Sequence, residues 1–142
     1  MEPGILGIVL DSSVLIAAER RKLTAIQAIE SIQTLLGELP IVLSAITIAE
    51  IGHGIYRANT SDIRQRRRAF LDDLKATLPI FPVTESTAEI IARIGGEQAS
   101  HGNNLPLADL IIGACALELR YAIGTRNERD FRRIPDLRVV RL

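Results

Sequence analysis

Four acidic residues occupy positions where a carboxylate is unusual. Asp11 directly follows the apolar residues 4–10, and Glu50 lies in a mostly apolar helical segment. Asp109 interrupts another apolar run, and Asp130 comes shortly after the apolar residues 121–125. Each acid taken alone has an ordinary explanation, such as a solvent-facing position or the N-terminus of a helix. Together they predict a cluster at one edge of the expected sheet. Asp11 and Asp130 follow the first and fourth strands. Asp109 opens the helix that leads into the fourth strand, and Glu50 lies about two turns into the helix after the second strand.

A cluster of carboxylates needs a positive partner. Two like charges ~4 Å apart repel by about 4 kcal/mol at an effective dielectric constant of about 20. Mg²⁺ and Mn²⁺ favour carboxylate and water oxygens, so either ion suits such a site. The chain has one cysteine, Cys115, and its two histidines, His53 and His101, lie far apart in the sequence. This set does not match the ligands of a zinc site.

The elements that must position these acids alternate along the chain. Strands are expected at residues 4–10, 40–44, 79–83, 121–125 and 137–142, with helical periodicity between them. This alternation predicts an α/β fold, a three-layer α/β/α sandwich with a central parallel sheet of about five strands. The prolines around residues 79–83 favour an edge position for that strand. Ligands of such sheets bind beyond the carboxyl ends of the strands, where the strand order reverses.

Length and composition indicate one folded unit. The chain has 142 residues, of which 47% are hydrophobic and 24% are charged, so we expect residues 1–142 to form a single domain. No apolar run approaches the roughly 20 residues that span a bilayer, and the apolar stretch near the N-terminus is too short for a signal peptide. We therefore expect a cytoplasmic protein without a membrane segment. Cys115 is expected to be a buried structural thiol.

Arginine dominates the positive charge, although the net charge is zero. Fifteen of the seventeen basic residues are arginine. One group forms the run "RQRRR" at residues 64–68, and another seven lie within residues 120–142 against three acids. Two interpretations stay open for both groups. They form either a solvated, salt-bridged surface or a rim that binds phosphate groups.

The acid-bearing stretches, taken in order, resemble the PIN-domain family. They are "VLDSSVLI", "TIAEIGHGI", "LADLIIGACAL" and "GTRNERDF", followed by the closing stretch "DLRVVRL". More narrowly, the chain is similar to the VapC-type toxins of bacterial and archaeal toxin–antitoxin pairs. The resemblance covers essentially the whole chain, and the ordered set of stretches is more specific than any one of them.

The resemblance implies a metal-dependent endoribonuclease that hydrolyses RNA phosphodiester bonds with Mg²⁺ or Mn²⁺. Asp11, Glu50 and Asp109 match the three central acidic positions of the metal site. The ion is expected on Asp11 and Asp109, with Glu50 bound directly or through water. Either Asp130 or Asn127 fills the fourth position, and we favour Asp130 as the catalytic acid. One or two ions would activate a water and stabilise the leaving oxygen.

The resemblance also assigns supporting residues. Ser13 matches a small hydroxyl residue often found beside the first acid, although it also suits a helix cap. Asn127 is a possible neutral contact to metal or water. Arg126 and Thr125 are expected to meet the phosphates of RNA, which gives affinity without sequence choice.

The resemblance further implies partners. Toxins of this type are usually homodimers, and a cognate antitoxin protein silences them. The apolar helical segments at residues 23–36 and 50–58 are expected to line a groove for the antitoxin. Ordinary core packing also explains part of each segment.

Two other functions share part of this sequence pattern. A phosphatase of the haloacid dehalogenase type uses a strand-one aspartate, as "LDSSV" offers, but it needs a second aspartate where this chain has Ser13. It also needs a late lysine, and the only lysines are Lys22 and Lys75. The non-enzymatic alternative is a PIN-like module that binds RNA or a partner without cutting.

Overall fold

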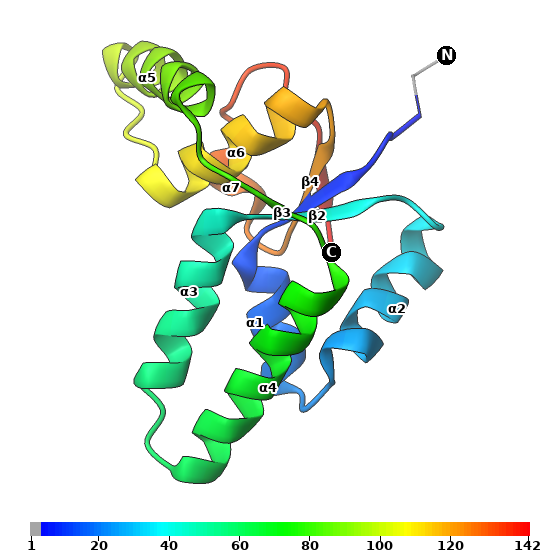
Figure 1. The fold of residues 1–142 in the computed structure, drawn as a ribbon. Helices are drawn as coiled ribbons and strands as arrows, with labels where there is room; N and C mark the ends of the chain where they lie inside the picture. Colours follow the sequence, from blue (N-terminus) through cyan, green and yellow to red (C-terminus); the bar gives the residue numbers. More distant parts are fainter. Residues whose placement is uncertain (1–3) are drawn as a thin grey trace.

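A five-stranded parallel sheet forms the centre of the computed structural model, which describes residues 4–142. The strands are β1 (Ile8–Leu10), β2 (Ile41–Ser44), β3 (Ile80–Phe81), β4 (Ala122–Thr125) and β5 (Val139–Arg141). Their order is β3-β2-β1-β4-β5, and every pairing is parallel (Figure 1). The predicted sheet is confirmed, including the edge position of the proline-flanked β3 and the reversal of strand order between β1 and β4.

The helices cover both faces of this sheet. Four lie on one face: α1 (Ser12–Arg20), α2 (Ala25–Leu36), α3 (Ala45–Tyr56) and α4 (Ser61–Thr77). Three lie on the other: α5 (Glu85–Ser100), α6 (Leu107–Leu119) and α7 (Glu128–Phe131) (Figure 1). Right-handed crossovers explain the division, because the chain steps outward one way from β1 to β3 and the other way from β4 to β5.

Each face of the sheet has its own hydrophobic core. Along β1, Ile8 and Leu10 join the cluster under α1–α4, whereas Val9 joins the cluster under α5–α7. Ala122 and Ile123 of β4 divide in the same way. Burial on both faces explains why the central strands are continuously apolar in sequence. Within residues 4–142, no helix combines the length and hydrophobicity needed to cross a bilayer.

Helix ends differ slightly from expectation for local reasons. The helix expected within residues 23–39 is α2, which is shorter because Thr24 and Gln27 form a capping box at its start. Gly37 ends it with a φ of 89°, a conformation that glycine adopts easily. Thr60 caps the start of α4, where its side chain accepts a hydrogen bond from the backbone N–H of Ile63. The one-turn helix α7 was not predicted.

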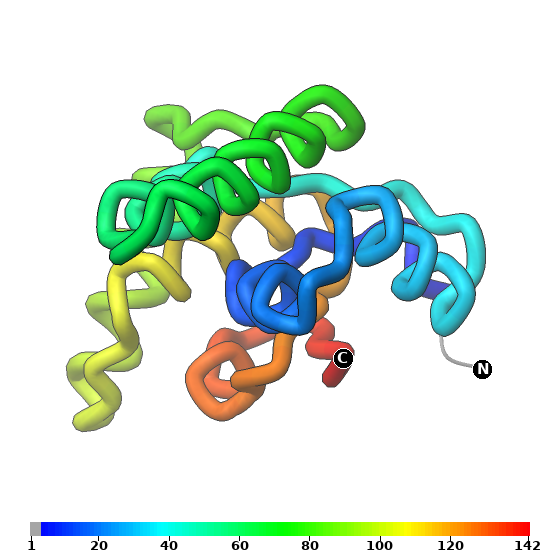
Figure 2. The backbone as a smooth tube through the Cα atoms, turned by 90° about the horizontal axis from the view of Figure 1, so that it is seen from below, coloured from blue at the N-terminus to red at the C-terminus, as the bar shows by residue number. Residues whose placement is uncertain are grey.

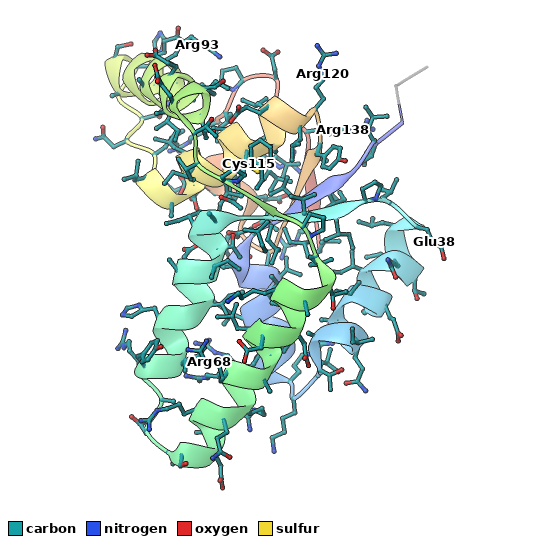
Figure 3. The ribbon with its side chains drawn as sticks, viewed as in Figure 1. Glu38, Arg68, Arg93, Cys115, Arg120 and Arg138 are labelled. Atoms are coloured by element: carbon teal, nitrogen blue, oxygen red, sulfur yellow. The ribbon has the colours of Figure 1, made fainter. Side chains whose placement is uncertain are left out.

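The arginine run at residues 64–68 fastens α4 to its neighbours. Arg66 and Arg67 both lie against the buried carboxylate of Glu19 in α1, at 3.1 Å and 3.7 Å. Arg67 also donates a hydrogen bond of 2.7 Å to a carbonyl oxygen of α3. Arg68 donates to the hydroxyl of Tyr56, where α3 and α4 meet (Figure 3). These contacts favour a structural role for the run over a phosphate-binding rim.

The single cysteine lies in the interior. Cys115 is buried in the middle of α6, close to the sheet (Figure 3). Burial, with a smaller contribution from Glu118, raises the pKa of its thiol to about 12. The thiol is therefore protonated at neutral pH and packs as a small apolar group, as predicted.

Candidate metal centre

The four acids meet in an open cleft of about 560 Å³ at the carboxyl ends of β1 and β4. Asp11 follows β1, Glu50 lies in α3, Asp109 in the first turn of α6, and Asp130 in α7. In the view from below, α1 lies between α7 and the α3–α4 pair (Figure 2). The cleft is also lined by Ser12, Ser13, Asn127, Glu128, Arg129 and Arg141.

Asp11 is the most rigidly held of the acids. It is 6% exposed and occupies the N-cap position of α1, although its side chain makes no capping hydrogen bond. Its Oδ2 accepts hydrogen bonds from the hydroxyls of Ser13 at 2.7 Å and Thr125 at 2.9 Å. Ser13 therefore contacts the first acid, and the N-cap of α1 is Asp11.

Glu50 carries an unsatisfied oxygen. Its Oε1 is buried and has no hydrogen-bond partner within residues 4–142. Burial raises the pKa of this carboxyl group, a hydrogen bond from Ser12 partly offsets the rise, and the charge of Asp11 adds to it. A buried carboxylate oxygen without a donor is costly, so this atom has capacity for a cation or a bound water.

The pKa of Asp109 responds to the charges of the other three acids. Burial, followed by repulsion from Asp11, Asp130 and Glu50, raises the pKa of Asp109 to about 6. An ordinary aspartate at a helix N-terminus has no such shift, because the helix dipole favours the charged form. The first turn of α6 thus directs a carboxylate toward three others despite their repulsion.

The β4–α7 segment offers more groups than expected. Asp130 lines the cleft and lies 3.9 Å from Arg133, and the exposed Asn127 lines it too, so both candidates for the fourth position are present. Glu128 was not predicted as a site residue. It lines the cleft but is paired with Arg132 at 2.8 Å and also with Arg141, so its charge is largely balanced.

Thr125 and Arg126, the two predicted phosphate contacts, do not line the acid cleft. Thr125 is 0% exposed, with its hydroxyl on Asp11, so its side chain supports the acid and does not face solvent. Arg126 lines a separate groove beside α1 and α2, and its backbone N–H donates to Ser13. The arginines that do line the cleft are Arg129 and Arg141. Which of these arginines faces the cleft depends on how the β4–α7 turn and β5 pack beside it, and position in the sequence alone did not indicate it.

The arrangement suits a hydrated divalent ion better than an ion held only by side chains. Within residues 4–142, no three acidic, histidine or cysteine side chains converge tightly enough to coordinate one ion directly. Mg²⁺ usually retains several waters and binds one or two carboxylates, so a direct contact with Asp11 and Asp109 and a water-mediated contact with Glu50 fit this geometry. The orphaned Glu50 oxygen and the oxygen-only chemistry of the cleft support that fit.

Burial of Asp109, together with repulsion from the other three acids, predicts a pH-dependent stability in the metal-free protein. The carboxyl group binds its proton more tightly when folded, with a pKa of about 6 against 3.8 for the free side chain. The free energy of unfolding should therefore fall as pH rises from about 4 to 6 and stay lower above that. Asp109→Asn should remove this loss and raise Tm at pH 7.5 by roughly 3 °C, the shift for about 1 kcal/mol in a chain of this size.

Thermal unfolding of both proteins in EDTA, at pH 4 and pH 7.5, measures this effect. Asp136→Asn is the matched control, because Asp136 is exposed and lies outside the cleft. Equal or lower Tm for Asp109→Asn at pH 7.5 would show that the four acids do not repel one another strongly.

Comparison with known proteins agrees with the geometry of the cleft. The model of the PIN-domain family matches residues 8–137. Ribonuclease VapC from Rickettsia bellii is 30% identical over 135 residues, which cover 95% of this chain and 96% of the relative. Ribonuclease VapC5 from Mycobacterium tuberculosis is 32% identical over 124 residues, covering 87% and 84%.

A solved structure shares the fold. The crystal structure of VapBC2 from Rickettsia felis, bound to a promoter DNA fragment, aligns with a TM-score of 0.79 at 19% identity and covers 94% of this chain and 97% of its own. At that identity the likeness concerns architecture alone. Since the family model matches residues 8–137, a range that includes all four acids of the cleft, the chain belongs to the PIN-domain family.

Proposed function

We propose that this protein is a metal-dependent endoribonuclease, the toxin of a VapBC-type toxin–antitoxin pair, which uses Mg²⁺ or Mn²⁺. One observation carries the proposal: carboxylates from four separate segments line one cleft, where burial and then repulsion from the other three raise the pKa of Asp109. Perturbed carboxylates in a cleft are a frequent sign of a functional site. The relatives named Ribonuclease VapC support the choice of RNA as substrate.

In this proposal Asp11 and Asp109 bind the ion, and Glu50 contacts it through a water. The ion, when bound, activates a water nucleophile and stabilises negative charge on the phosphate. Asp130 completes the acidic set, because its ion pair with Arg133 is long, at 3.9 Å. Asn127 also lines the cleft and would orient a water. Ser13 and Thr125 hold Asp11 in place.

Arg129 is the residue assigned to the RNA backbone. It is exposed, lines the cleft beside Asp130, and makes no ion pair with any residue from 4 to 142. Arg141 lines the same cleft but is engaged with Glu128 at 3.8 Å. Arginine's planar group matches phosphate oxygens, so Arg129 supplies affinity without reading sequence.

The proposed partners are a cognate antitoxin and a second copy of the chain. Solved neighbours of this fold are described as VapBC toxin–antitoxin complexes. A groove lined by residues of α1, α3 and α4 shares Glu50 with the acid cleft, so a segment lying in it would reach the acids. The proposal implies that residues 1–142 act as one PIN-like unit in the cytoplasm.

The alternatives receive less support from the cleft. A phosphatase of the haloacid dehalogenase type needs a lysine at the site, and the described residues that line the cleft include neither Lys22 nor Lys75. A non-catalytic binding module has no need for carboxylates that destabilise one another. Both alternatives remain outcomes of the next experiment.

Removing one carboxylate should abolish cleavage. Purified protein should cut RNA with Mg²⁺ or Mn²⁺ and lose that activity in EDTA. Asp11→Asn should lower the rate at least about 100-fold, because it removes a charged ligand of the ion that stabilises the transition state. Gel analysis of a labelled RNA with defined ends gives both rate and product.

Asp136→Asn should cut at the wild-type rate, because that acid lies outside the cleft. Undiminished cleavage by Asp11→Asn would contradict the proposed site. Release of phosphate from a small phosphomonoester, with RNA left intact, would indicate the phosphatase. RNA retention without a metal-dependent product would indicate the binding module.

Two arginines should separate RNA binding from stability. Arg129→Ala should weaken RNA binding several-fold at low salt and reduce its salt dependence by about one counterion, with Tm unchanged. Arg67→Ala should lower the stability by about 1–3 kcal/mol, because Glu19 loses a buried partner, and leave RNA affinity unchanged. Fluorescence anisotropy with Asp11→Asn as the common background measures binding without cleavage. The reverse pattern would place the RNA on α4.

A further inference from the structure

The hydroxyls beside Asp11 form two parallel relays. The backbone N–H of Asn127 donates to Thr125 Oγ1 at 2.9 Å, and Thr125 Oγ1 donates to Asp11 Oδ2 at 2.9 Å. The backbone N–H of Arg126 donates to Ser13 Oγ at 3.1 Å, and Ser13 Oγ donates to the same Oδ2 at 2.7 Å. Two consecutive peptide groups of the β4–α7 turn thus reach one carboxylate oxygen through two hydroxyls.

The direction of each relay is fixed by proton count. A hydroxyl group has one proton to give and oxygen lone pairs that accept. The ionised carboxylate of Asp11 can only accept, so each hydroxyl donates its proton to Oδ2, at 2.7 Å and 2.9 Å, in preference to the other hydroxyl at 3.4 Å, and accepts from the N–H of Arg126 or Asn127. A charged acceptor makes such hydrogen bonds stronger than those between neutral groups. Thr125 is fully buried, so water does not compete for its relay.

Both relays end on Oδ2, and this makes the two oxygens of Asp11 unequal. Within residues 4–142, no side chain donates a hydrogen bond to Oδ1. We propose that Thr125, assisted by Ser13, is a positioning residue that leaves Asp11 only one oxygen for a divalent ion and so favours a small octahedral ion over Ca²⁺. The inference rests on the proposed metal site.

The selectivity follows from the coordination preferences of the ions. Mg²⁺ requires near-octahedral geometry, whereas Ca²⁺ accepts six to eight oxygens and often takes both oxygens of a carboxylate. A carboxylate with one oxygen occupied by two donors offers a single ligand atom. The fully buried, hydrogen-bonded Thr125 thereby removes the bidentate contact that would benefit the larger ion.

The same relays tie the ion to the segment that carries the other cleft residues. The turn at residues 126–127 leads directly into α7, where Arg129 and Asp130 line the cleft. Pulling Asp11 Oδ2 away from its donors would loosen both N–H contacts of the turn. Occupation of Oδ1 by an ion leaves them intact, so ion binding and an ordered turn stabilise each other.

Titration of the full-length, metal-free protein with MnCl₂ and with CaCl₂, followed by calorimetry, tests the proposal. Thr125→Val keeps the shape and removes the hydroxyl. It should weaken Mn²⁺ binding roughly 10-fold, within the range for groups that orient a metal ligand. Ca²⁺ binding should weaken clearly less, so the ratio of Mn²⁺ to Ca²⁺ affinity falls. Thr125→Ser keeps the hydroxyl and should restore both affinities and their ratio.

The outcomes separate this inference from the proposed function. Wild-type protein that binds neither Mn²⁺ nor Mg²⁺ would overturn the proposed metal site itself. Wild-type binding that is unchanged in Thr125→Val would overturn only the positioning role. An equal loss of both ions in Thr125→Val would also overturn it, because general loosening of the cleft has no reason to discriminate between ions.

Ser13→Ala serves as a second variant, in case Thr125→Val fails to fold. Ser13 is only partly buried, and its hydroxyl reaches the same oxygen of Asp11. Its removal should shift the ratio of Mn²⁺ to Ca²⁺ affinity in the same direction by a smaller factor. An unchanged ratio in folded Ser13→Ala would contradict the proposal.

Discussion

Mutual repulsion of carboxylates is the constraint on which this structure depends. Asp11, Glu50, Asp109 and Asp130 line one cleft, and the pKa of Asp109 rises because burial and the other three acids oppose its charge. The chain would relieve this cost by turning any one of them outward. The fold prevents this outward turn, because each acid lies on or beside an element that other buried residues hold in place.

Most of these acids have a nearby group that reduces the cost. Two hydroxyl groups donate to Asp11, the N-terminus of α6 lies beside Asp109, and Arg133 lies near Asp130. Glu50 is only partly compensated, since Ser12 donates a hydrogen bond to its carboxylate but its Oε1 has no donor among residues 4–142. The negative charge of the cleft is therefore only partly balanced, and a bound cation is proposed to balance the rest.

The elements were predictable because strand and helix periodicity depends on burial. The central strands β1, β2 and β4 are mostly apolar since both faces of the sheet are covered there, and prolines marked β3 as an edge. The placement of Asp11 and Asp109 followed from the parallel order, which brings strand ends and helix starts to one edge. The one-turn helix α7 was missed because a single turn has too few residues for a periodic pattern.

Side-chain contacts between distant segments were less predictable. Thr125 and Arg126 were expected to face RNA, but the first lies under Asp11 and the second lines another groove. The sequence near these two residues does not indicate their orientation, because a side chain at the end of a strand turns inward or outward according to what packs beside it. The partners of Arg66 and Arg67 depend on Glu19, which lies 47 residues away from Arg66 in sequence.

Anomalous diffraction from crystals soaked in MnCl₂ tests the central claim most directly, because it locates the ion without reference to activity. The account predicts the strongest peak in the cleft, about 2.1 Å from a carboxylate oxygen of Asp11 and bordered by Asp109, with waters completing the octahedron. A cleft without a peak at saturating MnCl₂, or a dominant peak bound by other residues, would contradict it.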